Sequence, residues 1–159
     1  MNLHVDIQWA SSEPVPDEKD IRNWIAAALR DRSAQENFEI SVRLVDSDEM
    51  AALNNSYRGK PGPTNVLSFP ASLPAELDLP LLGDIVICAP VVIAEAALQG
   101  KTASAHWAHM AVHGTLHLLG YDHVEEQDAV LMEALESTIL SELNISCPYE
   151  SNVCREHSI

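Results

Sequence analysis

Hydrophobic and polar residues alternate in two separate stretches near the start of the chain. They alternate over residues 3–9 (LHVDIQW) and again over residues 38–45 (FEISVRLV). This period of two is typical of a strand with one buried face. Between the two stretches, apolar residues recur at helical spacing from a capping Asp17 to about Arg32. The pattern therefore predicts a strand, a helix and a second strand.

The middle of the chain predicts two further strands separated by loops that are rich in glycine and proline. A short helix opened by Asp46 or Ser47 is closed by the loop RGKPGP, because glycine and proline do not continue a helix. The predicted strands are residues 65–70 (NVLSFP) and 85–88 (IVIC), and Pro90 opens a helix that runs to about Gln99.

The last part of the chain predicts two helices, over residues 103–119 and 125–143. We expect residues 1–147 to form a single domain and residues 148–159 to be a disordered tail. All elements together predict an α/β fold of the α+β type, a small mixed sheet of about four strands covered by helices. The apolar stripe of the second helix is expected to consist of Val130, Leu131, Leu135, Ile139 and Leu143.

The composition is that of an ordinary globular domain, with 47% hydrophobic and 21% charged residues. There is no apolar stretch of the roughly 18 residues needed to span a bilayer, and no signal-peptide pattern at the N-terminus. A cytoplasmic location is therefore expected. The three cysteines form no C-x-x-C pair, which suits a reducing compartment, and Cys88 is predicted to be a small buried hydrophobic residue.

The formal net charge of −15 restricts how the chain can meet a polyanion. RNA is repelled by a surface of this sign unless basic groups are concentrated at one place. Arg58 and Lys60 lie close together in a Gly/Pro loop and could form such a place. The acidic residues crowd the C-terminal third: Glu125, Glu126, Asp128, Glu133, Glu136, Glu142 and Glu150.

The segment HGTLHLLGYDH carries the strongest chemical signal in the chain. His113 and His117 are one helical turn apart, so both imidazoles can converge on one point. Gly120 can leave the helix with positive φ and return His123 as a third ligand. Three imidazoles with an open fourth position are typical of a catalytic zinc site, whereas four protein ligands close a structural one. We predict one Zn²⁺ per chain on a central helix, although Ni²⁺ and Cu²⁺ also suit imidazole and could occupy the site in preparations.

The outline H-x-x-x-H-x-x-G-x-x-H is similar to that of the metzincin proteases, with one difference. The residue after the first histidine is Gly114 and not the glutamate that serves as general base, which disfavours peptide hydrolysis. Cleavage of a phosphodiester can rely mainly on metal-activated water and charge stabilisation.

Two neighbouring residues have alternative roles. His109, one turn before His113, could hydrogen-bond to a metal ligand or serve as an alternate ligand; the other possibility is a histidine hydrogen-bonded at the helix surface or packed beside Trp107. Asp122 either orients an imidazole or caps the following segment.

Three segments, SYRGKPGPTNVLSFP, LLGDIVIC and HMAVHGTLHLLGYDH, together resemble the YbeY family of bacterial endoribonucleases. The resemblance spans nearly the whole chain. It implies a metal-dependent nuclease for single-stranded RNA that acts in maturation of the 16S rRNA 3′ end and in ribosome quality control. It also implies zinc at the three histidines and a functional role for Arg58. Many relatives carry Asp where this chain has Asn65, to which we assign no acid–base role.

The chemistry of arginine independently supports a phosphate-binding role for Arg58, since a guanidinium can hold a phosphate bidentately and Lys60 adds a nearby positive charge. The substrate is thus expected to be single-stranded or ribosomal RNA, with the small ribosomal subunit and its proteins as partners and no DNA or membrane. A second hypothesis is a ribosome-assembly factor that mainly binds, with a structural metal, since an acidic surface favours basic protein partners. A third is metalloprotease activity. The sequence leaves open whether water or the 2′-hydroxyl attacks, where cleavage occurs, and the oligomeric state.

Overall fold

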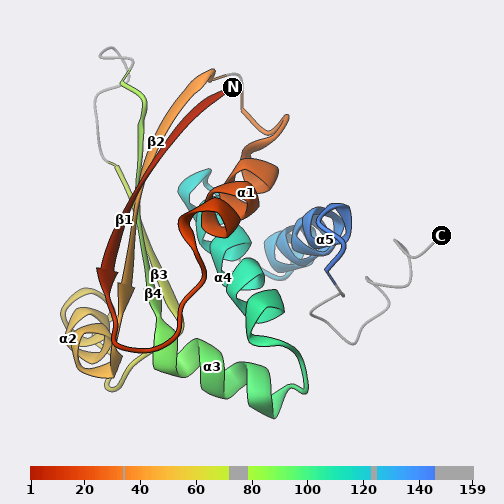
Figure 1. Cartoon of the computed structure of the whole chain (residues 1–159). Coiled ribbons are helices and arrows are strands. Elements are labelled where there is room, and N and C mark those ends of the chain that lie inside the picture. Colours follow the sequence, from red (N-terminus) through yellow and green to blue (C-terminus); the bar gives the residue numbers. More distant parts are fainter. Residues whose placement is uncertain (34, 72–78, 123–124, 146–159) are drawn as a thin grey trace.

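The computed structural model describes residues 1–33, 35–71, 79–122 and 125–145. The predicted tail, residues 148–159, lies outside the described residues. In chain order the elements are β1 (Asn2–Ala10), α1 (Glu18–Leu29), β2 (Asn37–Val45), α2 (Ser47–Arg58), β3 (Val66–Pro70), β4 (Leu81–Cys88), α3 (Ala89–Leu98), α4 (Ala103–Leu118) and α5 (Glu126–Glu142) (Figure 1).

The described strands form one four-stranded mixed sheet in the order β1-β2-β4-β3. β1 pairs with β2 and β2 with β4 in parallel, whereas the edge strand β3 is antiparallel to β4. The alternation read from the first two strands is confirmed, because Leu3 and Val5 face the core beside Phe38 and Ile40. The predicted fold class, a small mixed sheet covered by helices, is thereby confirmed.

The fourth strand is longer than predicted, since it begins at Leu81 and not at Ile85. Gly83 interrupts the hydrophobic pattern in the sequence, yet it pairs with Ile40 on one side and with Pro70 on the other. A Cβ at this position would lie 2.8 Å from a methyl group of Leu118 and still closer to a β3 carbonyl oxygen. The glycine is therefore required by close packing inside the sheet and does not mark its end.

The helices cover the sheet in layers (Figure 1). α1 and α4 lie against one face, α5 packs on α4 and α1, and α2 lies on the other side of the sheet. α4 is central, because it contacts α1, α3, α5, β3 and β4. Most side chains of α4 are therefore buried, and this helix carries four of the seven histidines.

Two helices differ from the sequence prediction in their limits or their buried face. α1 ends at Leu29 rather than Arg32, since Asp31 adopts a positive φ of 60°. In α5 the predicted apolar stripe is wrong at its start, because Val130 and Leu131 are 53% and 51% exposed. The face that turns inward instead carries Met132, Glu136, Ser137, Ile139 and Leu140.

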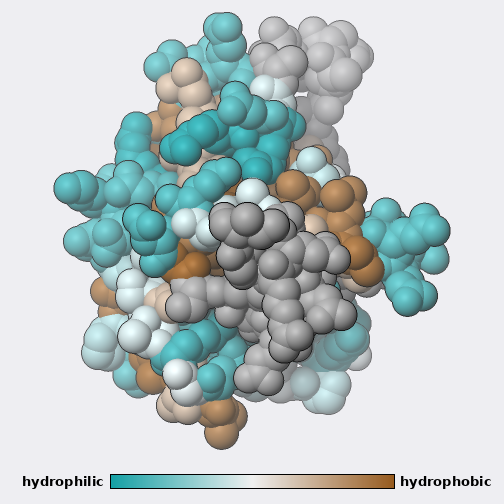
Figure 2. Space-filling view, turned by 90° about the vertical axis from the view of Figure 1, so that its right-hand side faces the viewer, coloured by the Kyte–Doolittle hydropathy of each residue, from teal (hydrophilic) through white to brown (hydrophobic). Residues whose placement is uncertain are grey.

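Figure 2 looks onto the side of the molecule that carries α5 and shows hydrophilic surface with smaller hydrophobic areas. Among the described residues, the helices are all too short or too polar to cross a membrane.

Cys88, at the end of β4, is fully buried, as predicted. Burial raises the pKa of its thiol, so the reactive thiolate is disfavoured at neutral pH. In a variant with Cys147 and Cys154 replaced by serine, we expect no alkylation by iodoacetamide at pH 8 in the native state and complete alkylation in denaturant. Mass spectrometry measures both, and rapid labelling of the native protein would contradict the burial.

Candidate metal centre

Two imidazoles meet on the C-terminal half of α4. The Nε2 atoms of His113 and His117 are 3.1 Å apart, and both rings are half-buried. Two nitrogens bound to one tetrahedral zinc at the usual Zn–N distance lie about 3.3 Å apart. The pair therefore has a donor type and a spacing that suit a single ion.

The chain turns directly after this pair, as the sequence analysis expected. α4 ends at Leu118, and Gly120 has a φ of 101°, with its N–H donating to the carbonyl oxygen of His117 at 3.0 Å. Positive φ favours glycine at this position. His123, the predicted third ligand, lies outside the described residues. Asp122, the last described residue before it, is exposed.

His113 and His117 line an open cleft of about 540 Å³ between α4 and the edge strand β3. Arg58, the last residue of α2, lines the same cleft together with Asn65 and Ser68. The structure thus places Arg58 beside the two histidines, although they are distant in sequence. Lys60 is exposed and does not line the cleft.

The sequence analysis missed the acidic residue nearest to the histidines. Glu136 of α5 is fully buried, and its Oε2 lies 3.1 Å from His109 Nε2 while its Oε1 contacts His113 Nδ1. Burial by itself raises the pKa of this carboxyl. The hydrogen bonds and charges of the two histidines together outweigh burial and hold the pKa at about 2. Glu136 is therefore a carboxylate at neutral pH.

His109, Glu136 and His113 form a group whose ligand atoms lie within 4.8 Å of one another, so it could hold a metal ion. The structure thus offers two possible metal positions next to His113, one at each nitrogen of its ring. The Nε2 side faces His117 and the cleft, whereas the Nδ1 side faces the buried Glu136. A substrate can reach only the first of these, because His109 and Glu136 are buried.

A second buried histidine supports the opposite wall of the cleft. His106 Nε2 lies 2.8 Å from Glu95 Oε1, and the Asn65 side-chain amide donates to the same oxygen at 3.1 Å. Asn65 Oδ1 in turn accepts from the Val66 N–H at 2.7 Å. Burial lowers the pKa of His106, so this imidazole is neutral at pH 7. The Asn65 amide is consequently fixed at both ends.

Gly114, which replaces the protease glutamate, faces the sheet. A Cβ there would lie 2.9 Å from a methyl group of Ile85 and 3.2 Å from Ser68 Oγ, which donates to the Gly114 carbonyl oxygen at 2.9 Å. A side chain at this position would therefore push α4 away from β3 and β4. The close approach of helix and sheet requires glycine here.

We expect Gly114→Ala to lower the melting temperature. Overpacking costs about 1–3 kcal/mol and exceeds the gain of up to about 1 kcal/mol that alanine has over glycine inside a helix. Ser104→Ala is the matched control, because Ser104 is exposed on the same helix and its replacement should not lower stability. Thermal unfolding followed by circular dichroism measures both, and a stabilised Gly114→Ala protein would contradict the tight packing.

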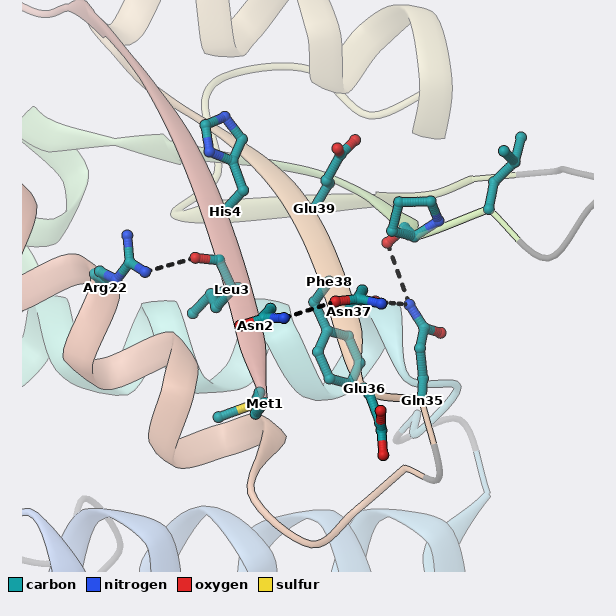
Figure 3. A pocket seen from close by; sticks show the side chains of 12 residues that line it. Met1, Asn2, Leu3, His4, Arg22, Gln35, Glu36, Asn37, Phe38 and Glu39 are labelled. Atoms are coloured by element: carbon teal, nitrogen blue, oxygen red, sulfur yellow. Dashed lines mark hydrogen bonds between the residues drawn. The ribbon is translucent and has the colours of Figure 1, made fainter.

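A larger hollow of about 900 Å³ lies elsewhere, around the start of β1 and β2 (Figure 3). Its polar groups are largely bonded to one another: Arg22 donates to the Leu3 carbonyl oxygen at 2.6 Å, and the side chains of Asn2 and Asn37 are joined at 3.0 Å. None of the histidines of α4 lines it. His4 is the one described histidine that lines this hollow, whereas two histidines with facing Nε2 atoms line the smaller cleft.

The fold and the cleft define the chain as an α+β protein with a histidine-rich site that could hold a metal ion. The family model described as "Endoribonuclease YbeY" matches residues 6–144. The endoribonuclease YbeY of Pseudomonas syringae pv. tomato is 53% identical over 156 residues, which cover 98% of this chain and 93% of that protein. The endoribonuclease YbeY of Stutzerimonas stutzeri is 51% identical, with 97% and 99% covered. The chain therefore belongs to the endoribonuclease YbeY family, a family of hydrolases that act on RNA.

A solved structure has the same fold. The solution structure of TM1509 from Thermotoga maritima aligns with a TM-score of 0.58 at 22% identity, covering 89% of this chain and 92% of that one. At this identity the likeness shows the fold alone. It is consistent with the mixed sheet and the central helix described above.

Proposed function

We propose that this chain is a zinc-dependent endoribonuclease that cleaves single-stranded RNA. Its proposed roles are maturation of the 16S rRNA 3′ end and ribosome quality control, in the cytoplasm, with the small ribosomal subunit as partner. The main support is that Arg58 and the facing Nε2 atoms of His113 and His117 share one open cleft. Family membership supports RNA as the substrate class.

We propose that His113 and His117 hold the metal ion, with His123 as a third ligand that the sequence spacing predicts. Both described imidazoles are half-buried and line the cleft, so that an ion held by Nε2 is open to substrate. When bound, zinc supplies Lewis-acid stabilisation of the phosphate and lowers the pKa of water to about 7.

Arg58 is the proposed phosphate-binding residue. Arg58 is exposed and lines the cleft, where its guanidinium can donate two parallel hydrogen bonds to phosphate oxygens. With a net charge of −15 over the whole chain, such a local cation is needed to bring RNA to the site. Lys60, exposed two residues further on, adds to this attraction without lining the cleft.

The test compares one RNA sequence in single-stranded and in duplex form. Purified protein should cleave the labelled single strand and should cleave the duplex much more slowly. Treatment with a chelator should abolish cleavage, and added zinc should restore it. A His117→Ala preparation purified side by side reports contaminating nuclease. Cleavage that continues unchanged in that preparation would overturn the proposal.

The acidic charge favours a second candidate function, a ribosome-assembly factor that mainly binds basic proteins of the small subunit. Co-sedimentation with ribosomal subunits separates the two functions. Binding that survives His117→Ala, together with no cleavage by the native protein, would favour the assembly factor.

A further inference from the structure

Glu136 is the one acidic side chain among the described residues that is fully withdrawn from solvent. A carboxylate in such a place is unfavourable unless hydrogen-bond donors face it. Its neighbours along α5, Met132, Ile139 and Leu140, are buried apolar residues, so that a leucine at position 136 would suit this helix face on packing grounds. The carboxylate therefore requires an explanation other than packing.

Each oxygen of Glu136 faces an imidazole nitrogen of α4. Oε1 contacts His113 Nδ1, and Oε2 lies 3.1 Å from His109 Nε2. A carboxylate only accepts hydrogen bonds, so both of these nitrogens must carry the hydrogen. In a neutral imidazole the other nitrogen then has the free lone pair. For His113 that nitrogen is Nε2, the atom that faces His117 Nε2 at 3.1 Å.

We propose that Glu136 is a positioning residue that holds His113 in the Nδ1–H tautomer and presents its Nε2 lone pair to the metal position in the cleft. Carboxylates in contact with a metal-binding histidine have this effect generally, since they set the tautomer, fix the ring and make the other nitrogen more basic. The inference rests on the proposed function, because it takes His113 as a metal ligand.

His109 completes the arrangement from the other side of the carboxylate. It lies one helical turn before His113, is 8% exposed and donates to the second oxygen of Glu136. Bound at both oxygens, the carboxylate has little freedom to rotate, so the bond to His113 has a defined direction. The contacts thus lead from His109 to Glu136, from Glu136 to His113, and from His113 to the cleft.

The alternative is that Glu136 and His109 are themselves metal ligands, since their atoms lie close enough. Two observations favour positioning. An ion there would replace the hydrogen bonds that Glu136 accepts, and it would be enclosed by buried side chains rather than open to the cleft. Coordination through Nε2 of His113 keeps these bonds intact.

The first experiment is independent of metal and of RNA. In metal-free protein labelled with ¹⁵N-histidine, NMR should show His113 as the Nδ1–H tautomer. In Glu136→Leu it should show a mixture of tautomers, whereas Glu142→Gln, an exposed position on the same helix, should leave the native tautomer unchanged. An Nε2–H tautomer of His113 in the unmodified protein would overturn the proposal.

The second experiment measures zinc affinity by competition with a chromophoric chelator. We expect Glu136→Leu to weaken zinc binding by about 10–100-fold while one ion per chain still binds at saturation, and Glu142→Gln to bind as the parent does. The Co²⁺-loaded proteins should have the same coordination number. Unchanged zinc affinity in Glu136→Leu would overturn the proposed positioning role. Loss of the ion or a changed Co²⁺ coordination number in this variant would also overturn it and would show that Glu136 is a metal ligand.

Circular dichroism establishes that Glu136→Leu is folded. Should it not fold, Glu136→Gln provides the same two measurements, because its amide keeps the size of the side chain and retains only one acceptor oxygen. The inference and the proposed function fail separately: a parent protein that binds zinc with the expected tautomer but does not cleave RNA would refute only the nuclease proposal.

Discussion

Replacing His117 by alanine is expected to reduce RNA cleavage by at least about 100-fold, the loss typical of removing one strong transition-state interaction, and to reduce zinc content in parallel. His117 is the suitable position because it faces His113 Nε2 and the cleft, whereas the buried Glu136 is bonded to His113 and His109. Removal of the His117 imidazole therefore leaves the buried contacts of Glu136 intact.

The measurement combines single-turnover cleavage of labelled RNA with elemental analysis of the dialysed protein. His4→Ala serves as a control, since His4 is exposed on β1 and lines a different hollow. An inactive His117→Ala protein with full zinc content would show that His117 acts on the substrate and not as a ligand.

Arg58→Ala should have the second largest effect, lowering kcat/KM by about 100-fold because a charge-assisted contact to the phosphate is lost. Arg58→Lys should restore part of the rate, since lysine keeps the charge but not the bidentate geometry. Zinc content should not change in either variant, because Arg58 is not a metal ligand.

The matched control is Lys60→Ala, which removes the same charge outside the cleft. We expect a loss of a few fold that shrinks as salt concentration rises, because Lys60 acts only through screened attraction of RNA. Equal losses for Arg58→Ala and Lys60→Ala would mean that Arg58 has no specific contact with the scissile phosphate.

Local sequence patterns were sufficient to predict the strands and helices that have one face exposed to solvent. The alternation in β1 and β2 and the capping Asp17 of α1 each show in a few neighbouring residues. The prediction was wrong where burial depends on a distant partner. β4 was read as starting at Ile85 because Gly83 was assigned to the preceding Pro-rich loop, and only the pairing of Gly83 with Ile40 and Pro70 shows that the strand begins earlier.

The residues of the candidate site also fall into those that the sequence predicted and those that it did not. The spacing of His113, His117 and Gly120 follows from helix geometry, so the facing imidazoles and the positive φ could be predicted. Glu136 was counted only among the acidic residues that crowd the C-terminal third. Its position at helical spacing between Met132 and Ile139 was the available signal, since these two residues and Leu140 define the buried face.

By itself, the sequence determined the order and type of the elements and the pairing of two imidazoles on one helix, because both depend on spacing along a regular backbone. Only the tertiary structure decided which residues from other elements join them. Arg58 lines the cleft from the end of α2, whereas the two histidines line it from α4, and Glu136 reaches His113 through the packing of α5 on α4. Such contacts join residues far apart in the chain, and no local period encodes them.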